Sequence, residues 1–426
     1  MMKNKIIKQS ILFLLFVSAG IFTSCETTEL DINDNPNSLT IDSANPNFIL
    51  NTIQFNFASQ NMNLSGISSG VMRHTNQFGT YANSSGAGTM NGAWANVYSI
   101  TNNLNLLKEL AKTQSLQKQV GIGQLLEAWA YVNLVDYIGT AVYSEAVNAD
   151  FPKPNLDSGT SIYDAMYLQL DTAISNLKGA SASDPIDLFY NGDMSKWIKA
   201  ANTLKLKMYI QSKLVSTNAK AQVNAILASG NYIKDSSDDF VIQFGTKETN
   251  PDNRHPWYQA AYVTGAGGTY MSNDFMSKLK DDKGFEDPRL KYYVYRQSLT
   301  APSGDKLPCA GNAAYDYCYI GDFYWGRGHG DDEGIPNDNN QRTTYGVYPA
   351  GGAFDEGVGN TATGSSSNLG GAGIYPIWLS SFSKFMLAEA SLPTPSGLGT
   401  NGTTLTYLTT AINDSFTKVA NFSGVA

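Results

Sequence analysis

The sequence has few of the residues from which catalytic centres and metal sites are most often built. Its 426 residues include only three histidines and three cysteines. His74, His255 and His329 are far apart, so none forms the helical pair of a zinc hydrolase. A G-x-x-x-x-G-K phosphate loop is also missing. Two carboxylates for glycoside hydrolysis leave no such signature, because they can lie far apart along the chain. We nevertheless expect a protein without catalytic activity and without a cofactor.

Basic clusters are scarce too. Charged residues make up 15% of the chain, and its formal net charge is −8. No run of lysines and arginines is long enough to follow a phosphate backbone, so we expect no nucleic-acid partner. Aromatic residues, by contrast, reach 12% and include 24 tyrosines. Tyrosine combines a flat apolar face with a hydrogen-bonding edge, which suits contact with sugars or peptides, although the same rings can fill a helical core.

The apolar run near the N-terminus predicts secretion. It extends from Ile11 to Phe22, and Lys3, Lys5 and Lys8 precede it. A membrane-spanning helix needs roughly 20 apolar residues, so this shorter run is typical of a secretory signal peptide, here residues 1–24. No later segment is apolar enough to span a bilayer.

The residues after this run predict a lipid anchor. Phe22-Thr23-Ser24-Cys25 resembles a bacterial lipoprotein box, although Phe22 stands where leucine is usual. Acyl chains on Cys25 would hold the protein on a membrane, with residues 25–47 as a polar tether. A plain signal peptide followed by a free thiol is the alternative.

The other two cysteines, Cys309 and Cys318, are close in sequence. In an oxidising compartment, such a pair predicts a disulfide that pins an irregular region. Two free, buried thiols are the alternative. A metal site is a weaker one, because no histidine stands near either cysteine.

Helical periodicity governs two parts of the chain, residues 48–235 and 375–420. Paired helices joined by short turns favour a mainly α-helical, tetratricopeptide-like scaffold. The lysines of the helix predicted at 194–214 are expected to form a solvated face. Residues 236–374 are instead rich in Gly, Asn, Asp, Pro and Tyr, which predicts a long, irregular, loop-rich subdomain with a function of its own. The predicted helices cover residues 48–63, 93–110, 117–137, 161–177, 194–214, 219–229, 270–280, 377–390 and 404–419.

Four segments in order resemble the SusD/RagB family of nutrient-binding outer-membrane lipoproteins. They are Leu126–Ala146, with LEAWAY and LVDYIG; the helix KWIKAANTLKL at Lys196–Leu206; the glycine-rich stretch WGRGHG from Trp325 to Gly330; and FMLAEA at Phe385–Ala390. The resemblance covers nearly all of the chain after Cys25, so residues 48–426 are expected to form one SusD-like domain. Family members usually continue beyond a helix that ends here near Val419.

The resemblance implies a location and partners. Members sit on the outer surface of Bacteroidetes-type bacteria, attached by lipid, as lids over a TonB-dependent transporter of the SusC/RagA kind. They bind glycans or peptides and are not enzymes. We therefore expect an outer-membrane glycan-uptake lipoprotein. A peptide-binding, RagB-like protein and an envelope scaffold that binds no ligand remain alternatives.

Candidate ligand residues follow from chemistry and position, since the ligand loops of the family vary. We select rings and hydrogen-bonding neighbours from the loop-rich region, where a sugar could stack on the rings and bond the polar groups. Packing of the same rings onto the scaffold is the alternative. The candidates are Trp257, Tyr258, Tyr262, Tyr324 and Trp325, with Asn253, Arg254 and Arg327.

The segment 331–340 contains several oxygen ligands, among them Asp331 and Asp338. Calcium accepts six to eight such oxygens from irregular loops, which makes these two aspartates weak calcium candidates. The segment lacks the spacing of an EF-hand, and a solvated turn is the favoured interpretation.

Overall fold

The structure is a computed structural model that describes residues 44–77, 79–81, 86, 88–263, 270–300, 319–331, 342–361 and 364–422. Within it, Asn45–Ala426 forms one compact unit. The predicted signal peptide, the lipid-anchor residue Cys25, the cysteine pair Cys309 and Cys318, and Asp338 lie outside the described residues.

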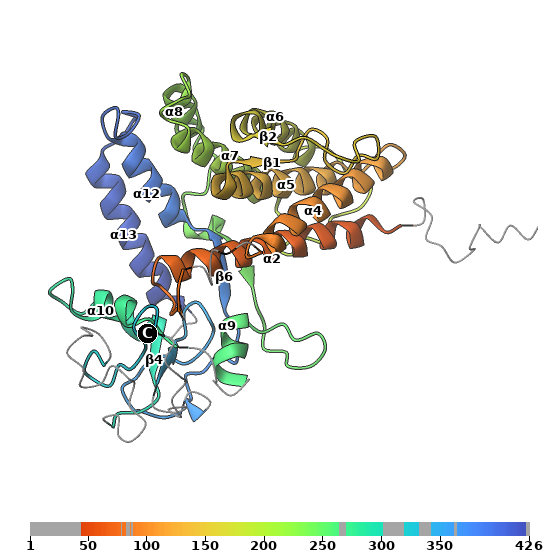
Figure 1. The fold of residues 1–426 in the computed structure, drawn as a ribbon. Helices are drawn as coiled ribbons and strands as arrows, with labels where there is room; N and C mark the ends of the chain where they lie inside the picture. The colour runs from red at the N-terminus through yellow and green to blue at the C-terminus, as the bar shows by residue number, and fades with distance from the viewer. Residues whose placement is uncertain are drawn as a thin grey trace, which may run out of the picture. The chain divides into compact units, whose positions relative to one another are not determined.

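The mainly α-helical fold predicted from the sequence is confirmed (Figure 1). The first long helix is longer than predicted and begins at Pro46, while Ser158 rather than Ser161 caps the fourth, accepting the Ser161 N–H at 3.1 Å. The long helices are α2 (Pro46–Val71), α4 (Asn91–Leu110), α5 (Gln117–Ile138), α6 (Gly159–Leu177), α7 (Met194–Gln211), α8 (Ala219–Ser229), α12 (Ser380–Ser391) and α13 (Thr404–Ala420).

The loop-rich region contains short elements. Among the described residues, the strands form three two-stranded antiparallel pairs, β1–β2, β3–β6 and β4–β5. The strands are β1 (Thr140–Ala141), β2 (Asp157–Ser158), β3 (Phe240–Gln243), β4 (Val294–Arg296), β5 (Thr343–Tyr345) and β6 (Ile374–Trp378). The short helical elements are a 3₁₀ turn (Ser236–Asp238), α9 (Pro256–Tyr258), a π-helical turn (Gln259–Val263), α10 (Asn273–Lys280) and α11 (Leu290–Tyr293).

Helix α5 lies at the centre of the scaffold. It contacts α4 and α2 on one side and α6 on the other, and nearly all its residues are buried (Figure 1). A helix enclosed on several sides is apolar around most of its circumference, and the run from Val120 to Val135 contains only three polar side chains, Gln124, Glu127 and Asn133. Two of them are hydrogen-bonded to α6: Gln169 donates to Glu127 at 2.9 Å, and Asn176 donates to Gln124 at 2.7 Å. It ends at Gly139, whose φ of +80° is a left-handed conformation that glycine adopts without strain.

A buried aromatic cluster connects the scaffold with the loop-rich region. Phe240 of β3 is fully buried, and its ring centroid lies 5.8 Å from that of Phe57 on α2. Trp129 of α5 and Trp197 of α7 approach it at 5.3 and 5.5 Å. Because β3 pairs with β6, which leads directly into α12, this cluster joins both helical parts of the scaffold. The loop-rich region has a second core of its own, which includes Tyr262, Met276, Tyr295, Tyr324 and Tyr345.

The expectation of a solvated lysine face on the helix predicted at 194–214 is wrong for four of its lysines, three of which lie on α7. Lys199 pairs with the buried Asp238 at 2.8 Å, and Lys205 pairs with Asp171 of α6 at 2.6 Å. These pairs connect α7 to neighbouring elements, so the lysines fasten the scaffold together instead of facing only water. The other two pairs are Lys207–Asp136 and Lys213–Glu389.

Candidate functional site

The aromatic ligand candidates come together in the loop-rich region, but most of them are interior. Tyr324, Trp325 and Arg327 are only 1, 2 and 0% exposed. Tyr258 and Tyr262 are buried as well. A buried ring has no open face on which a sugar could stack, so in this structure these five side chains pack the loops.

Two of these rings show what that packing does. Tyr258 and Tyr262 stack at 4.6 Å, and the Tyr262 hydroxyl donates to the carbonyl of Tyr345 at 2.5 Å while accepting the Ala353 N–H at 2.9 Å. Burial raises the pKa of Tyr262, so this hydroxyl stays protonated. Trp257 stacks on Tyr345 at 4.7 Å but remains partly exposed.

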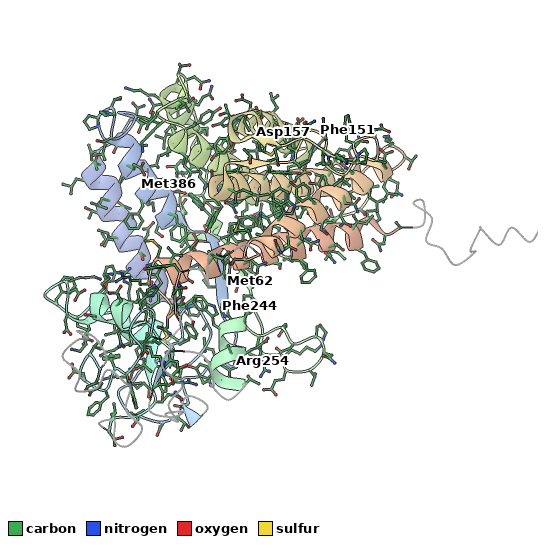
Figure 2. All side chains as sticks on the ribbon, viewed as in Figure 1. Met62, Phe151, Asp157, Phe244, Arg254 and Met386 are labelled. Atoms are coloured by element: carbon green, nitrogen blue, oxygen red, sulfur yellow. The ribbon has the colours of Figure 1, made fainter. Side chains whose placement is uncertain are left out.

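The two polar candidates beside them are engaged within their own loop. Asn253 is exposed, and its side-chain oxygen accepts the Lys247 N–H at 2.9 Å. The Arg254 guanidinium, labelled in Figure 2, makes a two-pronged contact with Asp252 and lies 3.0 Å from Glu248. Both residues therefore shape the loop at 245–254, and Asn253 and Trp257 keep the most surface of the eight candidates.

An exposed group of aromatic side chains lies where three distant loops meet. The segment after α2 pairs with the start of α10 through a bridge between Thr75 and Met271, and Ser272 bridges to Arg327. The Gly330 N–H donates to the carbonyl of Gln77 at 2.8 Å. We call this place the loop junction; its side chains are Arg73, His74, Tyr81, Asp274, Phe275 and His329.

The loop junction presents rings to solvent. Tyr81 is 47% exposed, and its ring centroid lies 5.3 Å from that of His329. His74 and Phe275 form a second pair, also at 5.3 Å. Rings on loops held by a firm scaffold are the usual means of contact with a ligand.

Charged groups flank these rings. A guanidinium nitrogen of Arg73 lies 3.8 Å from a carboxylate oxygen of Asp274, which also pairs with Lys278 at 3.2 Å. Arg73 has a φ of +59°, a left-handed conformation that is strained for arginine and is often found at functional sites. Burial lowers the pKa of His74 and of His329, so both imidazoles are neutral near pH 7. The His74 ring is exposed and can donate and accept a hydrogen bond, whereas both ring nitrogens of His329 are buried.

Sequence reasoning missed Tyr81 and His74, because it looked for ligand contacts only after residue 236. It missed Phe275 because that residue falls within the helix predicted at 270–280. One signal was available. Tyr81 stands in a stretch rich in Gly, Asn and Ser, the same composition that directed attention to the later loops.

Two chemical possibilities can be examined at atomic level. Asp331, a weak calcium candidate, has a carboxylate oxygen 3.8 Å from the Arg327 guanidinium, and the part of the chain that the structure describes contains no group of three acidic, His or Cys side chains placed to hold a metal.

The sequence Gly66–Gly70 has the G-x-S-x-G spacing of a serine hydrolase. Ser68 lies inside helix α2, however, and donates to the Leu64 carbonyl at 2.8 Å, so it is not on a nucleophile turn.

Fold and site together define a mainly α-helical, tetratricopeptide-like protein with aromatic side chains at the junction of three of its loops. The family model described as "Starch-binding associating with outer membrane" matches residues 36–308, and the chain belongs to this SusD-like family. No protein with a curated description matches the sequence. Over the described residues, no helix is both long and apolar enough to cross a membrane.

Solved structures share the fold at low sequence identity. A SusD-like protein described as Bacteroidetes AC2a is 17% identical with a TM-score of 0.62, over 89% of this chain and 78% of that one. A chitin-binding SusD homologue from Flavobacterium johnsoniae is 18% identical with a TM-score of 0.60, over 86% of this chain and 71% of that one. A SusD homologue from Bacteroides vulgatus is 19% identical with a TM-score of 0.59, over 87% of this chain and 72% of that one.

Proposed function

We propose that this protein is a cell-surface lipoprotein that captures a glycan at the loop junction and passes it to a TonB-dependent, SusC-like transporter in the outer membrane. Membership of a family described as starch-binding and associated with the outer membrane supports both the ligand class and the location. The Flavobacterium johnsoniae structure, described as chitin-binding, has the same fold. Cys25 is the proposed attachment point for the lipid.

The observation that carries the proposal is the half-exposed ring of Tyr81 beside His329. A sugar ring has an apolar C–H face that can lie on Tyr81, and hydroxyls that can bond the charged side chains beside it. Asp274 and Arg73 provide charged hydrogen-bond partners at the edge. Binding and release require no chemical step, which fits a protein that hands its ligand on unchanged.

The test uses the secreted part of the chain, residues 26–426, with maltohexaose and chitohexaose as probes in isothermal titration calorimetry. Tyr81→Ala should weaken binding of the preferred probe at least about fivefold, because stacked aromatic groups each contribute about 1–3 kcal/mol to comparable ring contacts. Phe151→Ala is the matched control, since Phe151 is also an exposed ring but lies on a scaffold loop between α5 and α6 (Figure 2).

Unchanged affinity in the Tyr81 variant would contradict the loop junction as the capture site. Binding of a casein digest with no response to either sugar would favour peptide capture instead. Release of shorter sugars from either probe would show catalysis and remove the proposal.

A further inference from the structure

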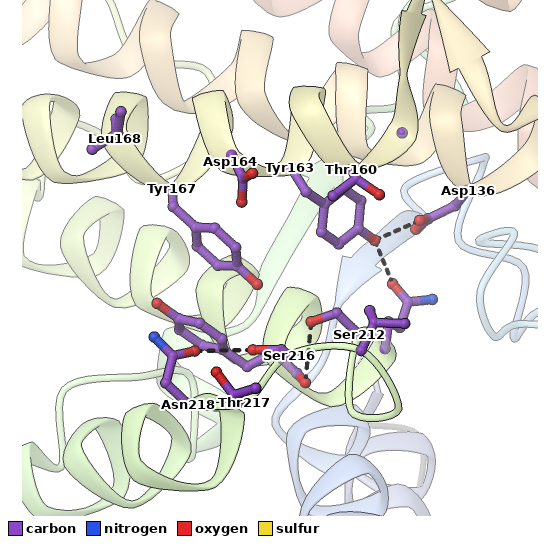
Figure 3. Close-up of a pocket in the computed structure, with 14 residues that line it drawn as sticks. Asp136, Thr160, Tyr163, Asp164, Tyr167, Leu168, Ser212, Ser216, Thr217 and Asn218 are labelled. Carbon is purple, nitrogen blue, oxygen red and sulfur yellow. Dashed lines mark hydrogen bonds between the residues drawn. The ribbon is translucent and has the colours of Figure 1, made fainter.

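A second concave site lies on the scaffold, away from the loop junction. A pocket of about 920 Å³ opens between α6 and the turn that joins α7 to α8 (Figure 3). Its volume falls within the range of roughly 300–1,000 Å³ that is typical of small-molecule sites. We call it the tyrosine pocket, because Tyr163, Tyr167 and Tyr209 line it together with Asp136, Asp164 and Ser212.

The three tyrosines form one connected platform. Tyr167 and Tyr209 stack face to face at 4.5 Å with their planes 17° apart, and Tyr163 meets Tyr167 edge-on at 6.4 Å. Tyr209 is buried beneath, whereas Tyr163 and Tyr167 are partly exposed. Figure 3 shows the side chains of Tyr163 and Tyr167 extending from α6 toward the α7–α8 turn. The platform therefore combines ring surface with hydroxyl groups.

Three hydroxyl donors of the polar lining are engaged within the protein. The Tyr163 hydroxyl donates to Asp136 at 2.6 Å, and the Ser216 hydroxyl donates to Asn218 at 2.9 Å. The Ser212 hydroxyl donates to the Met208 carbonyl at 2.8 Å. These three donors are used within the protein, and the exposed Asp164 carboxylate offers lone pairs, which suits a ligand rich in hydroxyl groups.

The charges of the pocket exclude one class of ligand. Lys207 pairs with Asp136 and donates to Gln211 at 2.8 Å, so the negative charge of Asp136 is already balanced. Asp164 is exposed and has no ion pair within the described part of the chain. No lysine or arginine lines the pocket. The uncompensated negative charge repels sulfated or uronic sugars and tolerates neutral ones.

The lining suits a sugar better than a peptide. Leu168 and Val215 stand at the pocket with 71 and 79% of their surface exposed, so they enclose no apolar recess for a side chain. The lining residues belong mainly to α6, α7 and the turn between α7 and α8, and none of them lies in a strand, so the pocket offers no strand edge to a peptide backbone.

From these observations we infer that the tyrosine pocket binds a short, neutral oligosaccharide, as a second sugar site on the helical scaffold. The inference rests on the proposed glycan-capture function and extends it. A pyranose ring lies on Tyr167, and its hydroxyls donate to the Asp164 carboxylate and to the oxygens of the turn. A long glycan could then be held at two places on one molecule, which raises its overall affinity without any new contact at the loop junction.

Calorimetry with maltohexaose and chitohexaose on residues 26–426 tests this site separately from the first. We expect two binding events per protein for the preferred probe. Tyr167→Ala should abolish the event at the scaffold, and Asp164→Asn should weaken it about fivefold. Asp164 is exposed, so its variant reports on binding even if Tyr167→Ala unfolds. Tyr81→Ala should weaken only the other event, and Phe151→Ala should change neither.

The outcomes distinguish the two proposals. If the wild-type protein shows a single binding event, and both tyrosine-pocket variants bind the probe as the wild type does, the pocket is not a sugar site. Capture at the loop junction then stands. If the wild type binds neither probe, both proposals fall. Two further results would overturn the inference. One is that the scaffold site binds a polygalacturonate hexamer more strongly than the neutral probes, and the other is that it binds a peptide and loses this binding in Tyr167→Ala.

Discussion

The indole N–H of Trp197 donates a hydrogen bond of 2.7 Å to a carboxylate oxygen of Asp187. The same carboxylate accepts the backbone N–H groups of Phe189 at 2.9 Å, Tyr190 at 3.1 Å and Gly192 at 2.9 Å. One side chain thus shapes the turn before α7 and fixes the ring that this helix contributes to the aromatic cluster around Phe240.

Replacing Asp187 with alanine should destabilise the protein substantially. Four donors lose their acceptor, and hydrogen bonds to a charged group are worth about 1.5–3 kcal/mol each. Water can replace part of this loss once the turn rearranges, so we expect the free energy of unfolding to fall by about 2–4 kcal/mol. Urea unfolding followed by tryptophan fluorescence measures it. Asp184→Ala is the control, because its side chain is 93% exposed and its ion pair with Lys118 is long, at 3.5 Å. Equal losses for both variants would contradict the assignment.

Much of the scaffold could be predicted from the sequence, because its signals are local. Buried residues at helical spacing, such as Trp197, Ala201, Leu204 and Met208, depend only on the period of the helix. The ion pairs of Lys205 and Lys207 could not be predicted, since their partners Asp171 and Asp136 lie on other helices. Charge on a helix face indicates exposure only when no neighbouring element supplies the opposite charge.

The candidate site was harder to predict, for a related reason. Tyr324, Trp325 and Tyr81 all stand in loops of similar composition, yet the first two are buried and the third is exposed. A loop of this length builds its own core, and which ring enters it depends on contacts with residues far away in sequence. Composition correctly indicated that the region is rich in rings; it could not distinguish packing rings from exposed ones.

A single hydroxyl in the core of the loop-rich region gives the second prediction. Tyr262→Phe removes the group that bonds both Tyr345 and Ala353, and it leaves a buried carbonyl and a buried N–H without that partner. An unsatisfied buried polar group costs about 1–3 kcal/mol, so we expect a loss of about 2 kcal/mol in the free energy of unfolding.

The matched control for that variant is Tyr407→Phe. Its hydroxyl also donates to a backbone carbonyl, that of Asn401, but at 3.2 Å and on the surface, where water can replace it. We expect less than about 0.5 kcal/mol for this change. Thermal unfolding of both variants at one pH provides the comparison. A Tyr262 variant as stable as the wild type would show that the loop core does not depend on this bond.

His255 should make stability depend on pH. Its Nδ1 accepts the Trp257 N–H at 3.1 Å, and burial lowers the pKa of its imidazole from 6.5 to about 4. Between those values the unfolded chain binds a proton that the folded protein excludes, so stability falls as the pH drops from about 6.5 toward 4. The full loss is about 3 kcal/mol, since one pKa unit corresponds to about 1.4 kcal/mol.

His255→Asn isolates this contribution. The asparagine side-chain oxygen can replace Nδ1 as the acceptor that caps α9, and it does not titrate in this range. Urea unfolding at pH 7 and at pH 5 should therefore show a smaller acid-induced loss for the variant than for the wild type. Parallel losses in the two proteins would assign the acid sensitivity to other groups.

We expect a single residue, Cys25, to decide whether the protein is attached to the membrane. If acyl chains on Cys25 are the anchor, Cys25→Ser should move the protein from the membrane pellet to the soluble fraction of the envelope, because two or more acyl chains are needed for stable attachment. Cys309→Ser is the control, since its predicted role is a disulfide with Cys318 rather than lipidation, and it should stay with the membrane. Among the described residues no helix could substitute as a span. Suppose that the Cys25 variant stays in the pellet after a high-salt wash, without the transporter present, and mass spectrometry shows that residues 1–24 have been removed. This result would require an anchor other than this cysteine and would remove the lipoprotein part of the proposal.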